Sequence, residues 1–258
     1  MSNEEFIYSV DEGIATLTFN RPQARNALTF EMYDGLAEIS QSIIDNHSDI
    51  HAMILTGAGD KAFAAGTDIS RFRDFKGAED ARNYERRMDH VLGVFESVPI
   101  PTIAAIRGAC TGGGAAIAAS CDIRIASDDL KYGFPIAKTL GNCLSIANLS
   151  RMANLIGAGR TKEIILTARL IRADEALNIG LVSEINSDPL LRSLELANTL
   201  KGHAPLTMAA TKEGLRRLRE KLADIENDDL IVQCYTSDDF REGLDAFLTK
   251  RTPQWKGS

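Results

Sequence analysis

Three consecutive glycines, Gly112 to Gly114, separate an apolar run from an alanine-rich run in the stretch TGGGAAIAASCD (111–122). The apolar run before them, VPIPTIAAIRG (98–108), is typical of a buried strand, and the alanines after them favour a helix. Glycines at such a junction let the chain turn tightly from strand to helix, or let another stretch of backbone approach closely. The motif therefore predicts a strand, a tight turn and a helix inside an α/β protein.

Strand and helix patterns alternate as far as about residue 145, and the chain is almost entirely helical after it. Residues 6–20 predict a hairpin, and Thr29 can cap a helix whose apolar face is formed by Met32, Leu36, Ile39 and Ile43. The other expected elements are a charged helix at 79–97 and strands at HAMILTG (51–57), CDIRIAS (121–127), KYGF (131–134) and LVSEI (181–185). This order gives an α/β fold class with a helical C-terminal portion.

The last two expected helices each carry a single apolar stripe. A helix with one apolar face has to pack against the body of the protein or against another subunit. The residues of the two stripes are Leu215, Leu218 and Leu222 in the first, and Phe240, Leu244, Phe247 and Leu248 in the second.

The composition is that of an ordinary globular protein, and it argues against several kinds of partner. Of the 258 residues, 44% are hydrophobic and 25% are charged, which gives ample material for a core. The net charge of −7 argues against nucleic acid or an anionic membrane as the main partner. No apolar run approaches the ~18 residues that span a bilayer, and the acidic start MSNEEFIYSV lacks the features of a signal peptide. The four cysteines have no metal-ligand spacing, so we expect reduced thiols, no metal and a cytoplasmic location.

Two interpretations of the three glycines stay open. They can be a purely structural turn, or they can leave the N–H groups at a helix start bare for an anionic ligand. A phosphate loop would need a Lys-Ser or Lys-Thr pair after the glycines, and a dinucleotide fingerprint would need glycine where Ile117 stands. A bare N–H at a helix start is half of an oxyanion hole, so the second interpretation requires another donor.

A second loop of small residues, GAGDKAFAAGTDISRF (57–72), offers such a donor. It also follows an expected buried strand, and Gly66 precedes a possible helix start at Thr67 and Asp68. The alternative for this loop is an ordinary connection in which Asp68 is an N-cap.

Four stretches together resemble the crotonase, or enoyl-CoA hydratase/isomerase, superfamily, in the order and spacing of that family. They are NRPQARNAL (20–28), GAGDKAFAAGTDI (57–69), IPTIAAIRGACTGGGAAIAASCDIRIAS (100–127) and EGLDAFLTKRTPQWKG (242–257). The resemblance implies a crotonase-like superhelix of ββα turns with a C-terminal helical trimerisation region. It divides the chain into a spiral core with an acyl-CoA site at 1–200 and an oligomerisation region at 201–258. It implies a homotrimer or a dimer of trimers.

The resemblance also implies where the substrate lies. Coenzyme A enters as part of a thioester substrate, and no cofactor is bound permanently. The thioester oxygen is expected between the N–H groups of Thr67 and Gly113, a pair that can stabilise an enolate. The family's coenzyme A contacts map onto Gln23, Ala24, Arg25, Ala65, Asp68, Ile69, Phe247 and Lys250. The last two commonly approach the ligand from a neighbouring subunit.

Two positions depart from the family's hydratases. Those enzymes keep one glutamate two residues after the glycine triplet and another after the proline of a segment like FGxPE. Here these positions hold Ala116 and Ile136, which cannot transfer a proton. Polar candidates that could replace the glutamates are Asn142, Ser145, Glu85 and His90.

The sequence therefore predicts an acyl-CoA-thioester enzyme of this type, a lyase or isomerase with an atypical active site that is not an efficient enoyl-CoA hydratase. The alternatives are a non-catalytic acyl-CoA-binding paralogue, and a decarboxylase or C–C lyase of the same superfamily. An RNA-binding role ranks last because the sequence has no basic patch.

Overall fold

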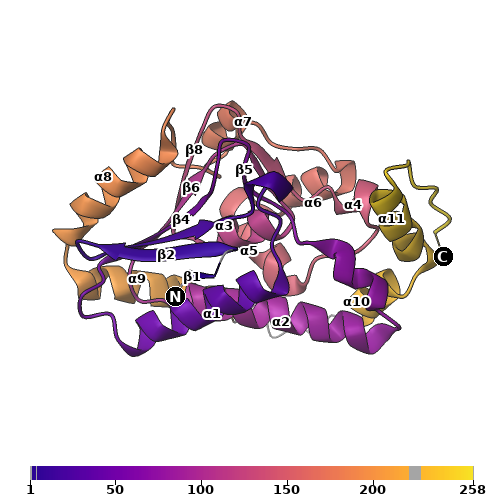
Figure 1. The fold of residues 1–258 in the computed structure, drawn as a ribbon, viewed down its shortest axis with the longest axis horizontal. Helices are drawn as coiled ribbons and strands as arrows, with labels where there is room; N and C mark the ends of the chain where they lie inside the picture. The colour runs from indigo at the N-terminus through magenta and orange to yellow at the C-terminus, as the bar shows by residue number, and fades with distance from the viewer. Residues whose placement is uncertain (1, 4, 221–227, 258) are drawn as a thin grey trace.

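Among the residues that the structure describes, the large sheet has seven strands in the order β1-β2-β3-β4-β6-β8-β10. A computed structural model describes residues 2–3, 5–220 and 228–257 (Figure 1). In this sheet β2 pairs antiparallel with both β1 and β3. The other neighbouring strands pair parallel to each other. Its strands are β1 (Ser2–Asn3), β2 (Phe6–Asp11), β3 (Ile14–Phe19), β4 (Ala52–Gly57), β6 (Thr102–Ile106), β8 (Ile123–Ala126) and β10 (Glu184–Ile185).

A second, smaller sheet is parallel throughout and consists of β5 (Ala62–Ala65), β7 (Ala109–Thr111) and β9 (Lys131–Gly133). Each of its strands follows a strand of the large sheet along the chain and precedes a helix. The units β4-β5-α2, β6-β7-α3 and β8-β9-α4 therefore repeat one ββα turn. The superhelix implied by the sequence motifs is confirmed.

Helices cover both faces of the large sheet. Figure 1 shows α1 and α2 running together along one side of the sheet, α8 on the other side, and α10 and α11 at the end where the chain finishes. No helix in the ranges that the structure describes is long and apolar enough to cross a membrane. The helices are α1 (Phe30–Asp45), α2 (Ala78–Glu96), α3 (Gly113–Ser120), α4 (Ile136–Thr139), α5 (Ile146–Ile156), α6 (Ala158–Thr167), α7 (Ala173–Asn178), α8 (Pro189–Lys201), α9 (Pro205–Glu220), α10 (Asp228–Tyr235) and α11 (Asp238–Thr249), with 3₁₀ helices η1 (Pro22–Ala24) and η2 (Ile69–Asp74).

Burial on both faces explains why the parallel strands read as continuous apolar runs. In β4, Met53 and Leu55 belong to the main core beneath α1 and α2, whereas Ile54 points the other way, into a smaller core covered by α8. Successive side chains of a strand point to opposite faces, so a strand covered on both sides cannot alternate apolar with polar residues.

Most of the expected elements are present. The hairpin is confirmed, and Thr29 caps α1 by accepting a hydrogen bond from the N–H of Met32 at 3.2 Å. The expected strand at 181–185 shrinks to the two residues of β10. Of the two apolar stripes near the C-terminus, Phe240 and Leu244 are buried, and Leu222 lies outside the described residues. The division between residues 200 and 201 stays a prediction.

A buried carboxylate fastens α9 to the body of the protein. Glu96, at the end of α2, accepts hydrogen bonds from Arg151 of α5 at 3.0 and 2.8 Å and from Arg219 of α9 at 2.5 Å. Burial opposes ionisation of this carboxyl, but the two guanidinium groups outweigh it and hold the pKa of Glu96 below its ordinary value. One carboxylate therefore joins three helices.

We expect Glu96→Gln to lower the free energy of unfolding by about 3–5 kcal/mol, because it removes the close carboxylate from the buried Arg151 guanidinium and leaves it only Asp89 at 3.9 Å. The pKa of Glu96 is depressed on folding, so its contribution is present above about pH 4.5 and is lost as the pH falls through the folded-state pKa. Urea denaturation at pH 7 measures the loss. Glu213→Gln, which removes a surface carboxylate of α9 paired with Arg216, should cost no more than about 1 kcal/mol. Equal losses in the two variants would contradict the assignment.

Candidate active site

A cavity of about 190 Å³ lies where η2, α2, the start of α3 and the segment after β9 meet, with α10 and α11 closing one side. It gathers residues that are far apart in the sequence. Among the residues that line it are Tyr33, Ala65, Gly66, Thr67, Ile69, Phe72, Tyr84, Glu85, Met88, Leu92, Gly112, Gly113, Ala116, Phe134, Ile136, Asn142, Cys143, Tyr235 and Phe247. The walls are mostly apolar, which is the ordinary character of a small-molecule site.

Gly112 and Gly113 line the cavity, and Gly114 behind them packs against β5, because two stretches of backbone meet there. A Cβ on Gly114 would strike the carbonyl of Ala64 in β5, and a Cβ on Gly113 would strike the hydroxyl of Tyr33 and lie 2.8 Å from Thr67 Oγ1. Gly112 has φ of 52°, a conformation that glycine adopts without strain. The glycines therefore both allow the tight turn into α3 and let the backbone of β5 approach closely.

The backbone around Thr67 directs one N–H away from the protein's own acceptors. Leu28 donates its N–H to the carbonyl of Gly66 at 2.9 Å and accepts the N–H of Asp68 at 2.8 Å. In this parallel bridge the N–H and carbonyl of Thr67 point to the side opposite Leu28. The N–H of Gly113 is in the first turn of α3, where no carbonyl of the helix can accept it.

Hydroxyl groups of two tyrosines stand close to Thr67 and Gly113, and that of a third lies farther along the wall. Tyr33 and Thr67 share a hydrogen bond of 2.9 Å between their side-chain oxygens, and Thr67 contacts the hydroxyl of Tyr84 at 3.4 Å. Farther along the wall, the amide of Asn142 donates to the hydroxyl of Tyr235 at 3.1 Å, and Tyr235 donates to Glu85 Oε1 at 2.5 Å. The cavity thus has an apolar lining with a short polar wall.

Glu85 has an unusual electrostatic setting. Burial, with a smaller contribution from the charge of the nearby Asp89, raises the pKa of its carboxyl to about 7, although the hydrogen bond from Tyr235 acts in the opposite direction. Burial also raises the pKa of Tyr84 and of Tyr235, so both stay protonated as donors. Next to them, Asn142 Oδ1 is buried without a partner among the described residues.

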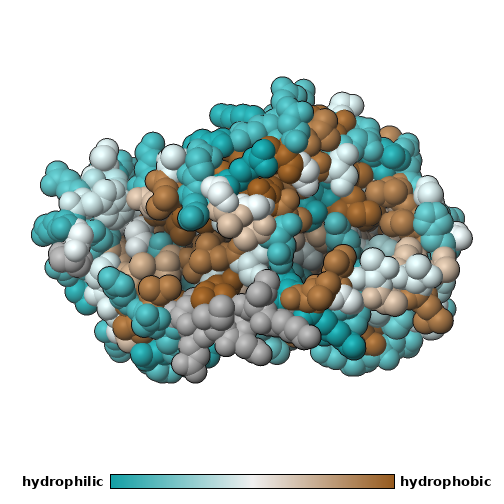
Figure 2. Space-filling model, turned by 180° about the vertical axis from the view of Figure 1, so that it is seen from behind, coloured by the Kyte–Doolittle hydropathy of each residue, from teal (hydrophilic) through white to brown (hydrophobic). Residues whose placement is uncertain are grey.

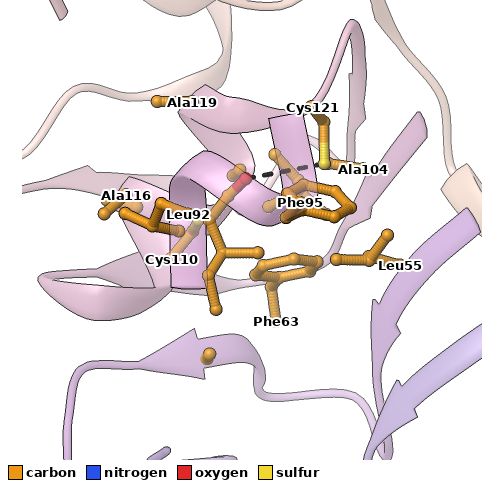
Figure 3. Packing of buried hydrophobic residues seen from close by; sticks show 14 of the residues in the cluster. Leu55, Phe63, Leu92, Phe95, Ala104, Cys110, Ala116, Ala119 and Cys121 are labelled. Carbon is orange, nitrogen blue, oxygen red and sulfur yellow. Dashed lines mark hydrogen bonds between the residues drawn. The ribbon is translucent and has the colours of Figure 1, made fainter. Parts of the chain in front are cut away.

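The structure brings most of the predicted catalytic positions into this one cavity. Thr67, Gly113, Glu85 and Asn142 line it, together with the apolar Ala116 and Ile136, the two positions at which the family resemblance leads us to expect hydratase glutamates. In Figure 3, Ala116 lies at one edge of the drawn core cluster, with Leu55, Phe63 and Phe95 to its right.

Two of the polar candidates lie elsewhere. Ser145 is the N-cap of α5 and donates to Asp89 Oδ1 at 2.7 Å, so its hydroxyl is occupied in fixing α5 to α2. His90 is exposed on α2, one residue beyond that contact. Neither of them is among the residues that line the cavity in the described part of the chain.

The residues mapped as coenzyme A contacts fall into two groups. Ala65, Ile69 and Phe247 line the cavity, and Phe247 does so from the same chain although its side chain is 54% exposed. Gln23 and Arg25 line a separate hollow of about 260 Å³ at the surface.

The two groups of expected coenzyme A contacts are connected through the backbone. The carbonyl of Arg25 accepts the N–H of Ala65 at 3.0 Å, so the segment with Gln23, Ala24 and Arg25 lies beside the end of β5. Lys250 is exposed at the end of α11.

Asp68 has a structural role in this region. Its carboxylate pairs with Arg21 at 3.1 Å and accepts the N–H of Ser70 at 3.2 Å, which makes it the N-cap of η2. The helix expected from Thr67 therefore begins two residues later, at Ile69. The arrangement favours the N-cap alternative for Asp68 while leaving the N–H of Thr67 in place for a ligand.

Two residues of the polar wall were not predicted from the sequence. Tyr33 follows Met32 on the buried face of α1, and Tyr235 ends α10, so each reads as an ordinary core aromatic. Only the tertiary packing, which places their hydroxyls beside Gly113 and Glu85, distinguishes them.

The family model for enoyl-CoA hydratase/isomerase matches residues 9–258. The chain belongs to the enoyl-CoA hydratase/isomerase family. It is 36% identical over 247 residues to the short-chain-enoyl-CoA hydratase of Clostridium acetobutylicum, with 92% of each chain covered. It is also 36% identical over 259 residues to the crotonyl-CoA hydratase of Syntrophomonas wolfei, with 97% of each chain covered.

A solved structure of methylmalonyl-CoA decarboxylase in complex with 2-nitronate-propionyl-CoA matches with a TM-score of 0.87 and 28% identity, and covers 100% of both chains. The resemblance drawn from the motifs and the crotonase-like fold class are thereby confirmed. As a member of the enoyl-CoA hydratase/isomerase family, the chain is an acyl-CoA enzyme.

We expect Gly113→Ala to lower the free energy of unfolding by about 1–3 kcal/mol, because the added Cβ meets the Tyr33 hydroxyl. In a Tyr33→Phe background the same change should cost less, because that hydroxyl is gone. Urea denaturation of the four proteins of this double-mutant cycle measures the coupling. Gly93→Ala, at a helix position with open space around it, is the control and should not destabilise. Equal costs of Gly113→Ala in both backgrounds would contradict the contact.

Proposed function

We propose that this chain acts on an acyl-CoA thioester by stabilising its enolate between the N–H groups of Thr67 and Gly113, and that it is not an efficient enoyl-CoA hydratase. Donors that are fixed before the reaction and aimed at a developing oxyanion lower the barrier to its formation. The observation that carries this proposal is the pair of N–H groups at one end of a mostly apolar cavity.

The make-up of the cavity walls supports the second half of the proposal. Hydration of a double bond needs groups that deliver a proton and activate a water, and carboxylates serve this purpose well. Among the described residues that line the cavity, Glu85 is the only Asp or Glu. Ala116 and Ile136 contribute only hydrocarbon. A reaction that moves a single proton at the α-carbon fits this set of groups better than hydration does.

A decarboxylation or a C–C cleavage is the second candidate reaction. Both of them generate the same enolate when a bond to the α-carbon breaks, and neither requires a protein acid and base on opposite sides of the substrate. The match to methylmalonyl-CoA decarboxylase over the full length of both chains favours this class. A non-catalytic acyl-CoA-binding role is the remaining alternative.

We further propose that the chain forms a homotrimer, or a dimer of such trimers, through α9. Leu206, Leu215 and Leu218 of this helix are 84%, 64% and 66% exposed, and the last two line a hollow of about 800 Å³. Figure 2 shows hydrophobic side chains in several patches on the face seen from behind. Exposed apolar surface of this kind is typical of an interface between subunits.

We expect the protein to exchange α-hydrogens of saturated acyl-CoA thioesters for deuterium in D₂O, while crotonyl-CoA hydration stays negligible. Mass spectrometry measures the first reaction, and loss of the enoyl absorbance measures the second. Rapid hydration of crotonyl-CoA would overturn the second half of the proposal. Tight binding of acyl-CoA without any exchange would instead indicate the non-catalytic role.

A matched pair of variants tests the N–H of Gly113. Gly113→Pro removes the N–H, but it also adds a Cβ that would strike Tyr33, so both variants are made in the Tyr33→Phe background. Gly113→Ala adds the same Cβ and keeps the N–H. We expect the proline variant to exchange deuterium ~10²–10³-fold more slowly than the alanine variant. Equal rates would remove Gly113 from the oxyanion hole.

We expect the double variant Leu215→Glu/Leu218→Glu to be monomeric, because charges would replace the apolar face of α9 at the proposed interface. Light scattering after size-exclusion chromatography measures the molar mass of this variant and of the wild type. Leu166→Glu, which changes a leucine of α6 that is 77% exposed, is the control and should keep the wild-type mass. A monomeric wild type would refute the trimer.

A further inference from the structure

Glu85 takes no part in the proposed stabilisation of the oxyanion by the N–H groups of Thr67 and Gly113. It lies on the face of α2 that also carries Tyr84, Met88 and Leu92, all of which line the cavity. Its side chain is 5% exposed, and no Lys or Arg is among the groups that shift its pKa. A buried carboxyl without a cationic partner is costly for a fold to keep, so its presence here requires an explanation.

Hydrogen bonds fix the orientation of this carboxyl and leave one of its oxygens open. Asn142 donates to Tyr235, which leaves the Tyr235 hydroxyl to donate to Glu85 Oε1. Glu85 Oε2 has no hydrogen-bond partner among the residues that the structure describes. Among the described residues, the fully buried side-chain oxygen or nitrogen that lacks a hydrogen-bond partner is Asn142 Oδ1, and Glu85 Oε2 is not such an atom. Glu85 Oε2 is therefore not sealed in protein but open to the cavity.

The open oxygen belongs to the same space as the two backbone N–H groups. The charge of Glu85 acts on the hydroxyls of both Tyr33 and Tyr84, and each of these hydroxyls contacts Thr67 Oγ1. The Tyr33 hydroxyl also lies against Gly113. A thioester held by Thr67 and Gly113 would therefore lie in the cavity that Glu85 also lines.

We propose that Glu85 is the proton-transfer group of this site, with Oε2 taking the α-proton of the bound acyl-CoA thioester and returning it. In the forward step the C–H bond breaks, the proton forms a bond to Oε2, and the electron pair moves through the α-carbon onto the thioester oxygen. The reverse step restores the C–H bond, and no other reactant is consumed. Tyr235 acts as a positioning residue that holds Oε1. This inference rests on the proposed enolate chemistry and names the residue that moves the proton.

The surroundings of Glu85 suit this role. The titratable groups that face it are Tyr33 from α1, Tyr84 and Asp89 from α2, Cys143 from the segment after α4, and Tyr235 from α10. Burial and the charge of Asp89 raise the pKa of Glu85 to about 7, so both protonation states are populated near neutral pH. A group of this kind can accept a proton and give it back with little loss in either direction.

The test compares deuterium exchange into propionyl-CoA and butyryl-CoA by the wild type and by Glu85→Gln. Glutamine has nearly the same shape and can still accept the Tyr235 hydrogen bond, so we expect a folded protein that exchanges at least ~10²-fold more slowly. Asp89→Asn is the matched control, because Asp89 is a partly buried carboxyl one turn farther along α2 that does not line the cavity among the described residues. We expect it to keep exchange within a few-fold of the wild type.

The pH profile separates catalysis from a structural role. The carboxylate is the active base, so wild-type exchange should rise with pH and level off above about 7. Tyr235→Phe removes a hydrogen bond that favours the carboxylate and should shift the midpoint to higher pH. Asp89→Asn removes a negative charge and should shift it to lower pH. A residue that only supports packing would lower the rate without moving the midpoint.

The outcomes are distinguishable. Exchange by the wild type that persists in Glu85→Gln, or a midpoint that neither Tyr235→Phe nor Asp89→Asn moves, overturns the role of Glu85 and leaves the proposed function standing. No exchange by the wild type with bound acyl-CoA, shown by isothermal titration calorimetry, refutes the proposed function and this inference with it. Loss of exchange in Glu85→Gln, with acyl-CoA binding retained and the midpoints shifted in opposite directions, supports both.

Discussion

The start of α3 packs against the end of β5 so closely that only glycine fits between them. Gly114 stands against the carbonyl of Ala64, and a Cβ on Gly112 would lie 3.4 Å from the Cα of Gly66. This contact locks the two small-residue loops together, and it brings the N–H groups of Thr67 and Gly113 to the same end of one cavity. The small parallel sheet, the tight turn and the helix start all depend on this approach of backbone to backbone.

Helix α2 shows how burial alone does not decide the ionisation of a carboxyl. Glu96 and Glu85 are both largely buried on this helix, but the pKa of the first is lowered and that of the second is raised. Two arginines surround Glu96 and favour its charge, whereas Glu85 has tyrosine hydroxyls and a second carboxyl nearby. One end of the helix thus holds a structural anion, and the middle holds a group suited to exchanging protons near neutral pH.

Apolar residues decide as much about the chemistry of the cavity as the polar ones do. Ala116 and Ile136 lie on its walls together with Phe134 and Leu92, so much of the lining of this cavity is hydrocarbon. A low local dielectric strengthens the interaction of fixed dipoles with a developing oxyanion. The same environment raises the pKa of the one carboxyl that lines the cavity within the described ranges.

The sequence by itself determined the family, the ββα repeat and the two loops of small residues that line the cavity. Those features depend on local chemistry: glycines where backbones meet, continuous apolar runs in strands covered on both faces, and Thr29 and Ser145 at helix starts.

Only the tertiary structure decided which polar side chains face the cavity. Ser145 and His90 looked as suitable as Glu85 in the sequence, but the packing of α2 against α5 and α10 turned only Glu85 toward the cavity. Tertiary packing also places the hydroxyls of Tyr33 and Tyr235 at this cavity. The direction of a side chain on a buried helix is set by what packs around it, and contacts between residues 85 and 235 leave no local signal in the sequence.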